Sequence, residues 1–251
     1  MQVVGWERLM AGQTPRSAVA LTIGVFDSLH LGHQELIRAV VEHRWGVPGA
    51  VCTFRRNPAQ VLGSRAVPGS ILSLRQKVER LEALGTALVV LIDFSTEISK
   101  LTGKRFLELL AGRFAIRRMV VGYNFHMGQG RDTGVESLRA MLAGTGAELQ
   151  VVPAARHGGE IVSSSRIRSC IREGRFDEAR ALIGQAYCLD LRDARLEPGA
   201  GAWSVPRREL GQVLPRPGAY RVLLRGPQAA REAVVRVGEE DVRGEGSAWG
   251  L

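Results

Sequence analysis

The hydrophobic pattern between Ser17 and Ile183 alternates between two kinds of segment. Short, continuously apolar runs predict buried strands, and the segments between them carry apolar residues three and four positions apart, which is typical of amphipathic helices. Strands are expected at 17–26, 49–54, 86–94, 116–125 and 147–155. Helices are expected at 33–45, 73–85, 102–114, 134–146, 164–176 and 176–184.

Continuously apolar strands that alternate with helices indicate an α/β fold, a doubly wound parallel sheet with helices on both faces. In such sheets ligands bind at the carboxyl ends of the strands. The polar, glycine-bearing segments of this chain lie mainly there, after the strand at 17–26 and after the strand at 116–125. We therefore expect the functional site at that edge of the sheet.

The chain changes character after about Tyr187, where proline, glycine and arginine become frequent. Residues 217–226 and 232–240 resemble short alternating strands joined by turns. The sequence thus predicts a large domain at 1–186 followed by a small β-rich domain at 187–251. The tail, 241–251, is expected to be disordered.

The charge balance is basic, with a formal net charge of +9. Lysine occurs only at Lys77, Lys100 and Lys104, so arginine supplies 34 − 3 = 31 of the basic groups. The arginines are scattered, and no arginine-rich block or aromatic-interleaved basic stripe is present. We therefore expect no nucleic-acid partner.

The distribution of apolar residues and cysteines bears on location. No apolar run approaches the roughly 18 to 20 residues that a membrane span needs, and the first residues do not read as a secretory signal. Cys52, Cys170 and Cys188 are odd in number and far apart, so they predict neither a disulfide framework nor a CxxC metal site. We expect a cytoplasmic protein that does not enter a membrane.

The segment TIGVFDSLHLGH, Thr22 to His33, ends a strand and begins a helix. A helix N-terminus attracts phosphate, and Gly32 lets a ligand approach the backbone closely. His30 and His33 can donate hydrogen bonds to phosphate oxygens whose negative charge grows when an α-phosphate is attacked. The alternatives are structural histidines or metal ligands. A metal site wants further ligands, and the remaining histidines do not have ligand spacing.

Two later segments fit the same chemistry. In VSSSRIR, Ser164 and Ser165 with the backbone N–H groups of a helix start form an anion nest, and Arg168 adds a bidentate donor. A plain helix cap is the alternative, and it is compatible with phosphate binding. In VVGYNFHMGQGRDTG, Asn124 is a candidate for a hydrogen bond to a base, ribose or phosphate, although a connecting loop explains that segment equally well.

The segments GVFDSLHLGH, TFRRNP, VGYNFHMGQGR and VSSSRIR occur in this order with family-like separations. Together they resemble the bacterial FAD synthetase family, the bifunctional riboflavin kinase/FMN adenylyltransferases, over roughly residues 17–187. The resemblance implies a Rossmann-like nucleotidyltransferase of the HxGH type, with ATP and FMN as substrates. The implied reaction transfers AMP to FMN and gives FAD and pyrophosphate, with Mg²⁺ neutralising charge on the triphosphate.

The resemblance also implies roles for individual residues. The catalytic group is His30, His33 and Arg168. No metal ligand is assigned. The binding group is expected to shape the nucleotide loop, hold the nucleotide, Mg²⁺ or flavin phosphate, contact the flavin, and form a second phosphate-binding segment; it comprises Gly24, Phe26, Asp27, Gly32, Phe54, Asn124, Ser164 and Ser165.

Several positions depart from the family pattern. Ser28 stands where the family usually has glycine, which fits if φ there is negative. The run 55–57 replaces an acidic-Pro-His run, Met127 replaces an aromatic residue, and Ser165 replaces threonine. The segments expected to bind the flavin therefore match the family pattern less well than the segments expected to bind ATP.

The C-terminal segment departs further, because WSVPRREL occupies the place of the kinase signature G-x-P-T-A-N. We expect a truncated kinase domain without riboflavin kinase activity. Two alternatives stay open: a related nucleotidyltransferase with a different acceptor, and a non-enzymatic flavin- or nucleotide-binding protein. The sequence does not indicate an oligomeric state.

Overall fold

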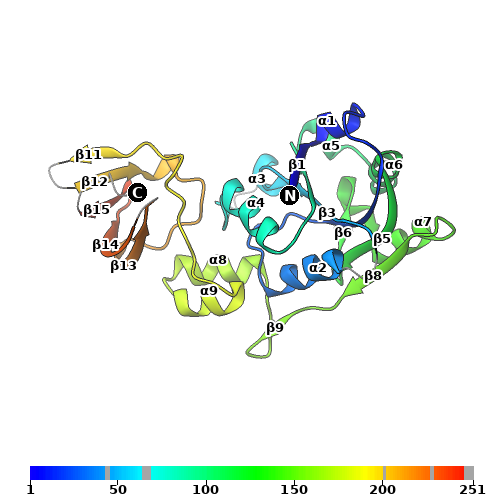
Figure 1. Cartoon of the computed structure of the whole chain (residues 1–251). Coiled ribbons are helices and arrows are strands. Elements are labelled where there is room, and N and C mark those ends of the chain that lie inside the picture. Colours follow the sequence, from blue (N-terminus) through cyan, green and yellow to red (C-terminus); the bar gives the residue numbers. More distant parts are fainter. Residues whose placement is uncertain (43–45, 64–68, 200–201, 227–228, 246–251) are drawn as a thin grey trace. The chain divides into compact units, whose positions relative to one another are not determined.

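The structure, a computed structural model, describes residues 1–42, 46–63, 69–199, 202–226 and 229–245. The chain forms two compact units (Figure 1). The first comprises Met1–Val67 and Leu74–Ser163, and the second comprises Pro68–Ser73 and Ser164–Leu251. This division falls before the residue 186 boundary expected from the sequence, and the assignment of 1–186 to nucleotidyltransferase chemistry stays a prediction.

The first unit contains a six-stranded sheet in the order β1-β4-β3-β2-β5-β8. All neighbouring strands are parallel, which confirms the expected doubly wound α/β fold. The sequence pattern did not predict β1, because a strand of four residues is too short to show a period. The strands are β1 (Gln2–Gly5), β2 (Ser17–Ile23), β3 (Gly49–Phe54), β4 (Leu88–Ile92), β5 (Phe114–Gly122) and β8 (Glu148–Val152).

The helices of the first unit connect these strands, and the four longest coincide with predicted helices. They are α1 (Trp6–Met10), α2 (Leu31–Val41), α3 (Pro58–Val61), α4 (Leu74–Ala83), α5 (Thr96–Ser99), α6 (Gly103–Arg113) and α7 (Val135–Leu142). Residues 43–45, predicted as the end of the helix at 33–45, lie outside the described residues. Within the described ranges, no helix of the chain has the length and apolar character of a membrane span.

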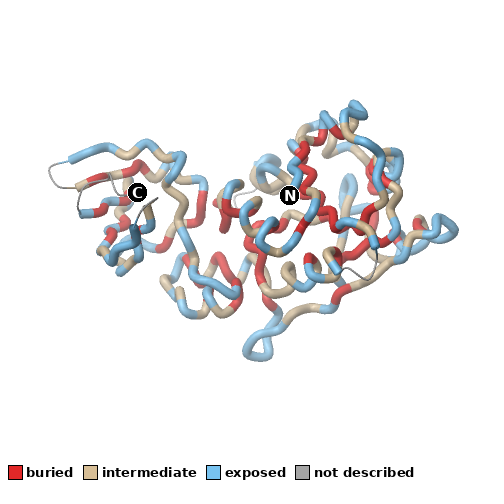
Figure 2. The backbone as a smooth tube through the Cα atoms, in the orientation of Figure 1, coloured by how far each residue is buried: buried red, intermediate tan, exposed pale blue. Residues whose placement is uncertain are grey.

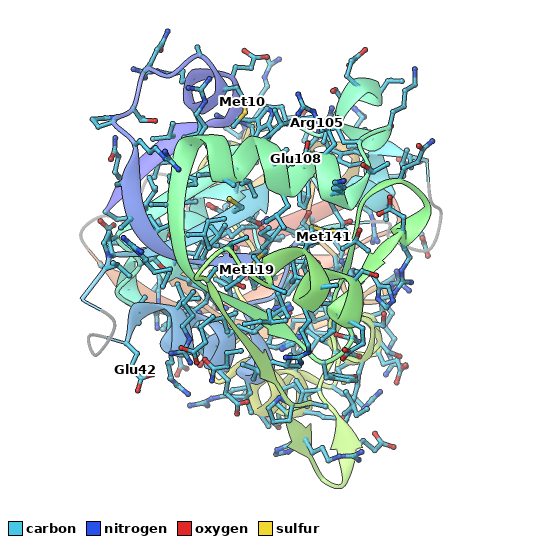
Figure 3. The ribbon with its side chains drawn as sticks, turned by 90° about the vertical axis from the view of Figure 1, so that its right-hand side faces the viewer. Met10, Glu42, Arg105, Glu108, Met119 and Met141 are labelled. Atoms are coloured by element: carbon cyan, nitrogen blue, oxygen red, sulfur yellow. The ribbon has the colours of Figure 1, made fainter. Side chains whose placement is uncertain are left out.

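Both faces of the sheet are covered, as the alternation along β2 shows. Val19 and Leu21 point into a core with residues of α6 and α7, whereas Ala20 packs on the opposite face with residues of α2. Figure 3 shows the first of these sides, with Arg105 on α6 and Met119 on β5. The central strands β2, β3 and β4 are largely buried (Figure 2), so the middle of the sheet lies in the core of this unit.

Short elements complete the first unit. Two ribbons each pair a two-residue strand with another, β6 (His126–Met127) with β7 (Thr133–Gly134) and β9 (Arg156–His157) with β10 (Glu160–Ile161). A 3₁₀ turn, η2 (Gln129–Arg131), lies between β6 and β7. The loop after β5 is therefore ordered by its own small hairpin.

The second unit combines two helices with a five-stranded antiparallel sheet in the order β11-β12-β15-β14-β13. Trp203 is its largest fully buried side chain, and it packs directly on Gly244, where a Cβ would lie 2.3 Å from the indole ring. The elements are α8 (Ser164–Arg172), α9 (Phe176–Ile183), β11 (Glu197–Gly199), β12 (Ala202–Pro206), η3 (Arg207–Glu209), β13 (Gly218–Arg225), β14 (Ala230–Val237) and β15 (Asp241–Glu245).

One expectation for this unit is wrong. Residues 241–245 are not disordered but form β15, which pairs with β12 and β14 in the middle of the sheet. The arginine, glycine and glutamate of this segment are not typical of a strand, so the sequence pattern did not predict it. In the structure Val242 and Gly244 are buried and alternate with exposed residues. Residues 246–251, the rest of the expected disordered tail, lie outside the described residues.

Candidate functional site

The candidate residues of the first unit follow three neighbouring strands. β3, β2 and β5 are adjacent and parallel, so their carboxyl ends meet at one edge of the sheet. The loop 24–30 follows β2, Phe54 is the last residue of β3, and Asn124 lies two residues after β5. The structure therefore brings the nucleotide loop, the flavin candidate and the polar loop to the same edge, as the sequence predicts.

The loop 24–30 has a backbone shape that its packing imposes. Phe26 has φ 48° and Leu29 has φ 45°, which is left-handed backbone that non-glycine residues rarely adopt. Both side chains are buried, and the Phe26 ring packs on Gly24, where a Cβ would lie 2.9 Å from the ring. Only glycine therefore fits at position 24. Ser28 is not among the residues with positive φ, so it adopts the negative φ that its departure from glycine requires.

His30 is the N-cap of α2. Its backbone is extended, with φ −64° and ψ 172°, and its Nδ1 accepts the hydrogen bond of the His33 backbone N–H at 3.2 Å. An Nδ1 that accepts carries no proton, so the neutral ring carries its proton on Nε2. Burial of the side chain lowers the pKa of His30 to about 4. His30 is thus a neutral imidazole with one N–H to donate.

His33 lies against His30 one turn into the helix. The two rings stack with centroids 3.7 Å apart and planes at 14°, and the Phe26 ring meets His33 edge-on at 5.2 Å. Burial is the main cause that holds the pKa of His33 well below its usual value, and electrostatic interactions with His30 and Lys77 act in the same direction. Its Nδ1 is buried and has no hydrogen-bond partner in the described part of the chain. A ligand oxygen is a suitable partner for a neutral imidazole in this position.

Gly32 lies between the two histidines in the first turn of α2. A Cβ there would approach the Cβ of Ala155 to 3.3 Å and the Cε1 of His30 to 3.4 Å, so the position has little room for a side chain. The first turn of α2 carries no acidic residue. Its backbone N–H groups and the positive end of the helix dipole therefore remain favourable to an anion.

Helix α4 contributes two basic residues that sequence reasoning did not select. The Lys77 ammonium is buried and donates to the carbonyl oxygens of Val25, at 3.0 Å, and Phe54, at 2.9 Å. Arg80 donates to the carbonyl of Ser28 at 3.3 Å. Burial lowers the pKa of Lys77 to about 8, although the Asp27 carboxylate opposes this shift. The rarity of lysine in this chain is the sequence feature that could have identified Lys77 as a site residue.

Two of the residues after β3 that depart from the family pattern make local structural contacts. Arg55 forms an ion pair with Asp93 at 3.0 Å, and Asn57 caps α3 by accepting the N–H of Ala59 at 3.0 Å. The Phe54 ring is half-buried and meets Phe94 edge-on at 5.7 Å. These two altered residues therefore have local structural contacts, while Phe54 keeps an aromatic surface at the sheet edge.

The loop after β5 is held by a glycine contact. Gly128 has φ +82°, and a Cβ there would lie 2.1 Å from Oδ1 of Asp132, whose carboxylate accepts the N–H of Gly103. Met127 packs against the main core, so replacement of the family's aromatic residue keeps an apolar side chain there. Asn124 is exposed on this loop, and its side chain is free of the core.

The second phosphate-binding segment belongs to the second unit. Helix α8 begins at Ser164, so Ser164 and Ser165 occupy its first turn. Arg168 is buried and its Nε donates to the carbonyl of Gly69 at 3.3 Å. The structure thus brings these three residues together on one helix, in a different unit from the histidines. Their participation in one site with His30 and His33 stays a proposal.

A parallel α/β sheet with a pair of stacked histidines at the helix start after a central strand is the arrangement expected of a nucleotidyltransferase of the HxGH type. Residues 13–166 match the family model described as FAD synthetase. The chain belongs to the FAD synthetase family.

Several known proteins are similar to the chain. The bifunctional riboflavin kinase/FMN adenylyltransferase of Escherichia coli is 26% identical over 222 residues, which cover 85% of this chain and 70% of that protein. The FAD synthetase of Listeria monocytogenes is 28% identical over 175 residues, which cover 68% of this chain and 71% of that protein. The Bacillus subtilis bifunctional enzyme is 29% identical over 185 residues, 72% of this chain and 57% of that protein.

A solved structure shares the fold. The crystal structure titled macrolide-efflux protein from Streptococcus pneumoniae superimposes with a TM-score of 0.83 and covers 99% of this chain and 85% of that chain. The two sequences are 22% identical, so this likeness supports the architecture alone.

Proposed function

We propose that the chain is an FMN adenylyltransferase, which transfers AMP from ATP to FMN and releases FAD and pyrophosphate. One observation carries the proposal: two neutral, stacked imidazoles at the N-terminus of α2, at the carboxyl end of a central parallel strand. The family membership and the names of the relatives support the same reaction.

In the proposed reaction a phosphate oxygen of FMN attacks the α-phosphorus of ATP. The new P–O bond forms as the bond from the α-phosphorus to the bridging oxygen breaks, and pyrophosphate leaves with that oxygen. Nε2–H of His30 and an N–H of His33 donate to phosphate oxygens, beside the free N–H groups of α2. Because negative charge on these oxygens grows in the transition state, fixed donors lower the barrier without a nucleophilic side chain.

The remaining candidates supply binding. Gly24, Phe26 and Asp27 shape the nucleotide loop, Phe54 offers its ring to the flavin, and Asn124 holds the nucleotide or the flavin phosphate. In the second unit, the first turn of α8 and Arg168 form the second phosphate-binding segment. Arg168 suits this role because a guanidinium donates two parallel hydrogen bonds to phosphate.

We propose Mg²⁺ as the metal that accompanies ATP. The described residues hold no cluster of three histidine, cysteine, aspartate or glutamate side chains, so the donors present do not form a closed metal cage. Mg²⁺ retains waters and binds mainly through substrate phosphates with one or two protein oxygens, which fits this site. When bound, it neutralises charge on the triphosphate. Asn124 is the protein oxygen that we expect nearest to it.

We further propose that riboflavin kinase activity is absent, since Trp203–Leu210 stands where the kinase signature is expected and forms β12 and a short 3₁₀ turn. The alternatives, a different acceptor and a non-enzymatic binder, are not favoured by the comparisons. The described cysteines are free thiols, which supports the proposed cytoplasmic location.

A paired assay tests the proposal. Purified protein is incubated with ATP and Mg²⁺ and with either FMN or riboflavin, and the products are separated by chromatography. We expect FAD from FMN and no FMN from riboflavin. Absence of FAD in the FMN tube would contradict the adenylyltransferase assignment, and appearance of FMN in the riboflavin tube would contradict the loss of kinase activity.

A further inference from the structure

Lys77 connects two segments that the proposed function assigns to different substrates. Its buried ammonium donates to the carbonyl of Val25, in the loop that precedes the histidines, and to the carbonyl of Phe54, at the end of β3. The Val25 carbonyl also accepts from the Thr53 hydroxyl at 3.0 Å. Three side-chain hydrogen bonds therefore join the nucleotide loop to the strand end that carries the flavin candidate.

A lysine at this position is a specific choice. The chain contains 34 basic residues, of which only three are lysines, so arginine is the ordinary basic residue here. Lys100 and Lys104 are exposed, whereas Lys77 is 4% exposed. An ammonium is a compact charge that fits between two carbonyl oxygens, and a planar guanidinium is larger and has a fixed fork of donors. The site between Val25 and Phe54 is thus shaped for an ammonium.

A buried ammonium is also costly for the fold. Burial disfavours its charged form, as the lowered pKa of Lys77 shows, even though the Asp27 carboxylate attracts it. An apolar side chain on α4 would avoid that cost. The presence of a charge here therefore points to a requirement of the site and not to stability alone.

We propose that Lys77 is a positioning residue, which fixes the separation between the loop that holds His30 and the strand end that carries Phe54. This inference rests on the proposed function. With ATP phosphates on the histidine side and flavin on the Phe54 side, the Lys77 bridge sets how closely the acceptor phosphate approaches the α-phosphorus. Its charge also disfavours a proton on His33, which helps to keep that imidazole neutral before substrate binds.

The test compares Lys77→Met with Lys104→Met, which removes the same charge from the exposed face of α6. We expect Lys77→Met to lower kcat for FAD formation on the order of 10²-fold, because a small misplacement of reacting groups has an effect of that size. ATP affinity, measured directly by calorimetry, should change little, since the histidines and α2 remain. Lys104→Met should match the wild type in both measurements.

A second variant covers the case in which Lys77→Met does not fold. Lys77→Arg keeps the charge and the donors but enlarges the group between the carbonyls, so it should also lower kcat while ATP affinity is retained. Wild-type kcat in either folded variant would overturn the positioning role. An equal loss of kcat and ATP affinity in both would overturn it too, since that pattern indicates general disruption of the loop.

Failure of the proposed function gives a different result. If wild-type protein forms no FAD, the adenylyltransferase assignment fails, and the Lys77 bridge is tested by backbone NMR. Loss of the two hydrogen bonds in Lys77→Met should shift the backbone signals that report on the Val25 and Phe54 carbonyls, and Lys104→Met should leave those signals unchanged. Unchanged signals at both positions in a folded Lys77→Met protein would overturn the inference independently of the reaction.

Discussion

The ligand-free protein should lose stability between about pH 7 and pH 5 because of its buried histidines. The folded state holds the pKa of His30 at about 4, whereas a histidine in an unfolded chain has a pKa of about 6.5. As the pH falls through this window, the unfolded chain takes up a proton that the folded protein does not. The free energy of unfolding therefore falls as the pH falls.

The size of the effect follows from the difference between the two pKa values. One pKa unit corresponds to about 1.4 kcal/mol, so at about pH 5 the His30 contribution alone removes about 2 kcal/mol. His33 acts in the same direction, since its pKa is also lowered. Hydrogen bonds from Ser169 and Arg166 lower the pKa values of Glu173 and Glu178, so these carboxylates titrate below the window. The histidines should therefore make the largest contribution to the loss of stability between about pH 7 and pH 5.

Urea unfolding followed by circular dichroism, without nucleotide, measures this loss. His30→Asn is the matched control, because asparagine is a favourable N-cap and does not titrate in the window. We expect the free energy of unfolding to fall less steeply with pH in His30→Asn than in the wild type. Equal pH dependence in the two proteins would refute the burial of a neutral His30.

Four further predictions concern three single residues and the metal. His30→Ala should lose the cap and about 1 kcal/mol of stability, whereas His30→Asn should not; both should lower kcat by about 10²- to 10³-fold in steady-state assays, as loss of a transition-state donor does. Gly24→Ala should cost about 1–3 kcal/mol in thermal unfolding, because its Cβ would meet the Phe26 ring; Gly112→Ala, where no atom lies within 4 Å of the new Cβ, should cost nothing. Phe54→Ala should raise the KM for FMN and leave the KM for ATP unchanged, and an equal rise for both would contradict a flavin contact. Chelation of Mg²⁺ should abolish FAD formation, and full activity in excess chelator would exclude the metal.

The hydrophobic pattern was sufficient for five of the six strands of the parallel sheet, because buried strands and amphipathic helices differ in period and in length. The position of the loop 24–30 was also predictable, since a strand end, a glycine and a helix start are local features of the sequence. The N-cap role of His30 was not predicted, because histidine is not a usual capping residue and the accepting atom is identified only by the ring orientation.

The part played by Lys77 could not be read from the pattern. It lies on α4, and its partners Val25 and Phe54 are separated from it by 52 and 23 residues along the chain. Nothing local distinguishes it from an exposed lysine on an amphipathic helix. β15 was missed for a related reason: its stability comes from pairing with two neighbouring strands and from the contact of Gly244 with Trp203, not from its own composition.

Two residues of the loop 24–30 have left-handed backbone angles, and this affects how fast a nucleotide can bind. Phe26 and Leu29 keep unfavourable backbone angles because their side chains are buried in the folded protein. The unfavourable conformation is therefore reached during folding, before any ligand arrives. Nucleotide binding then requires no ordering of this loop, so association should follow a single kinetic phase whose rate rises in proportion to nucleotide concentration.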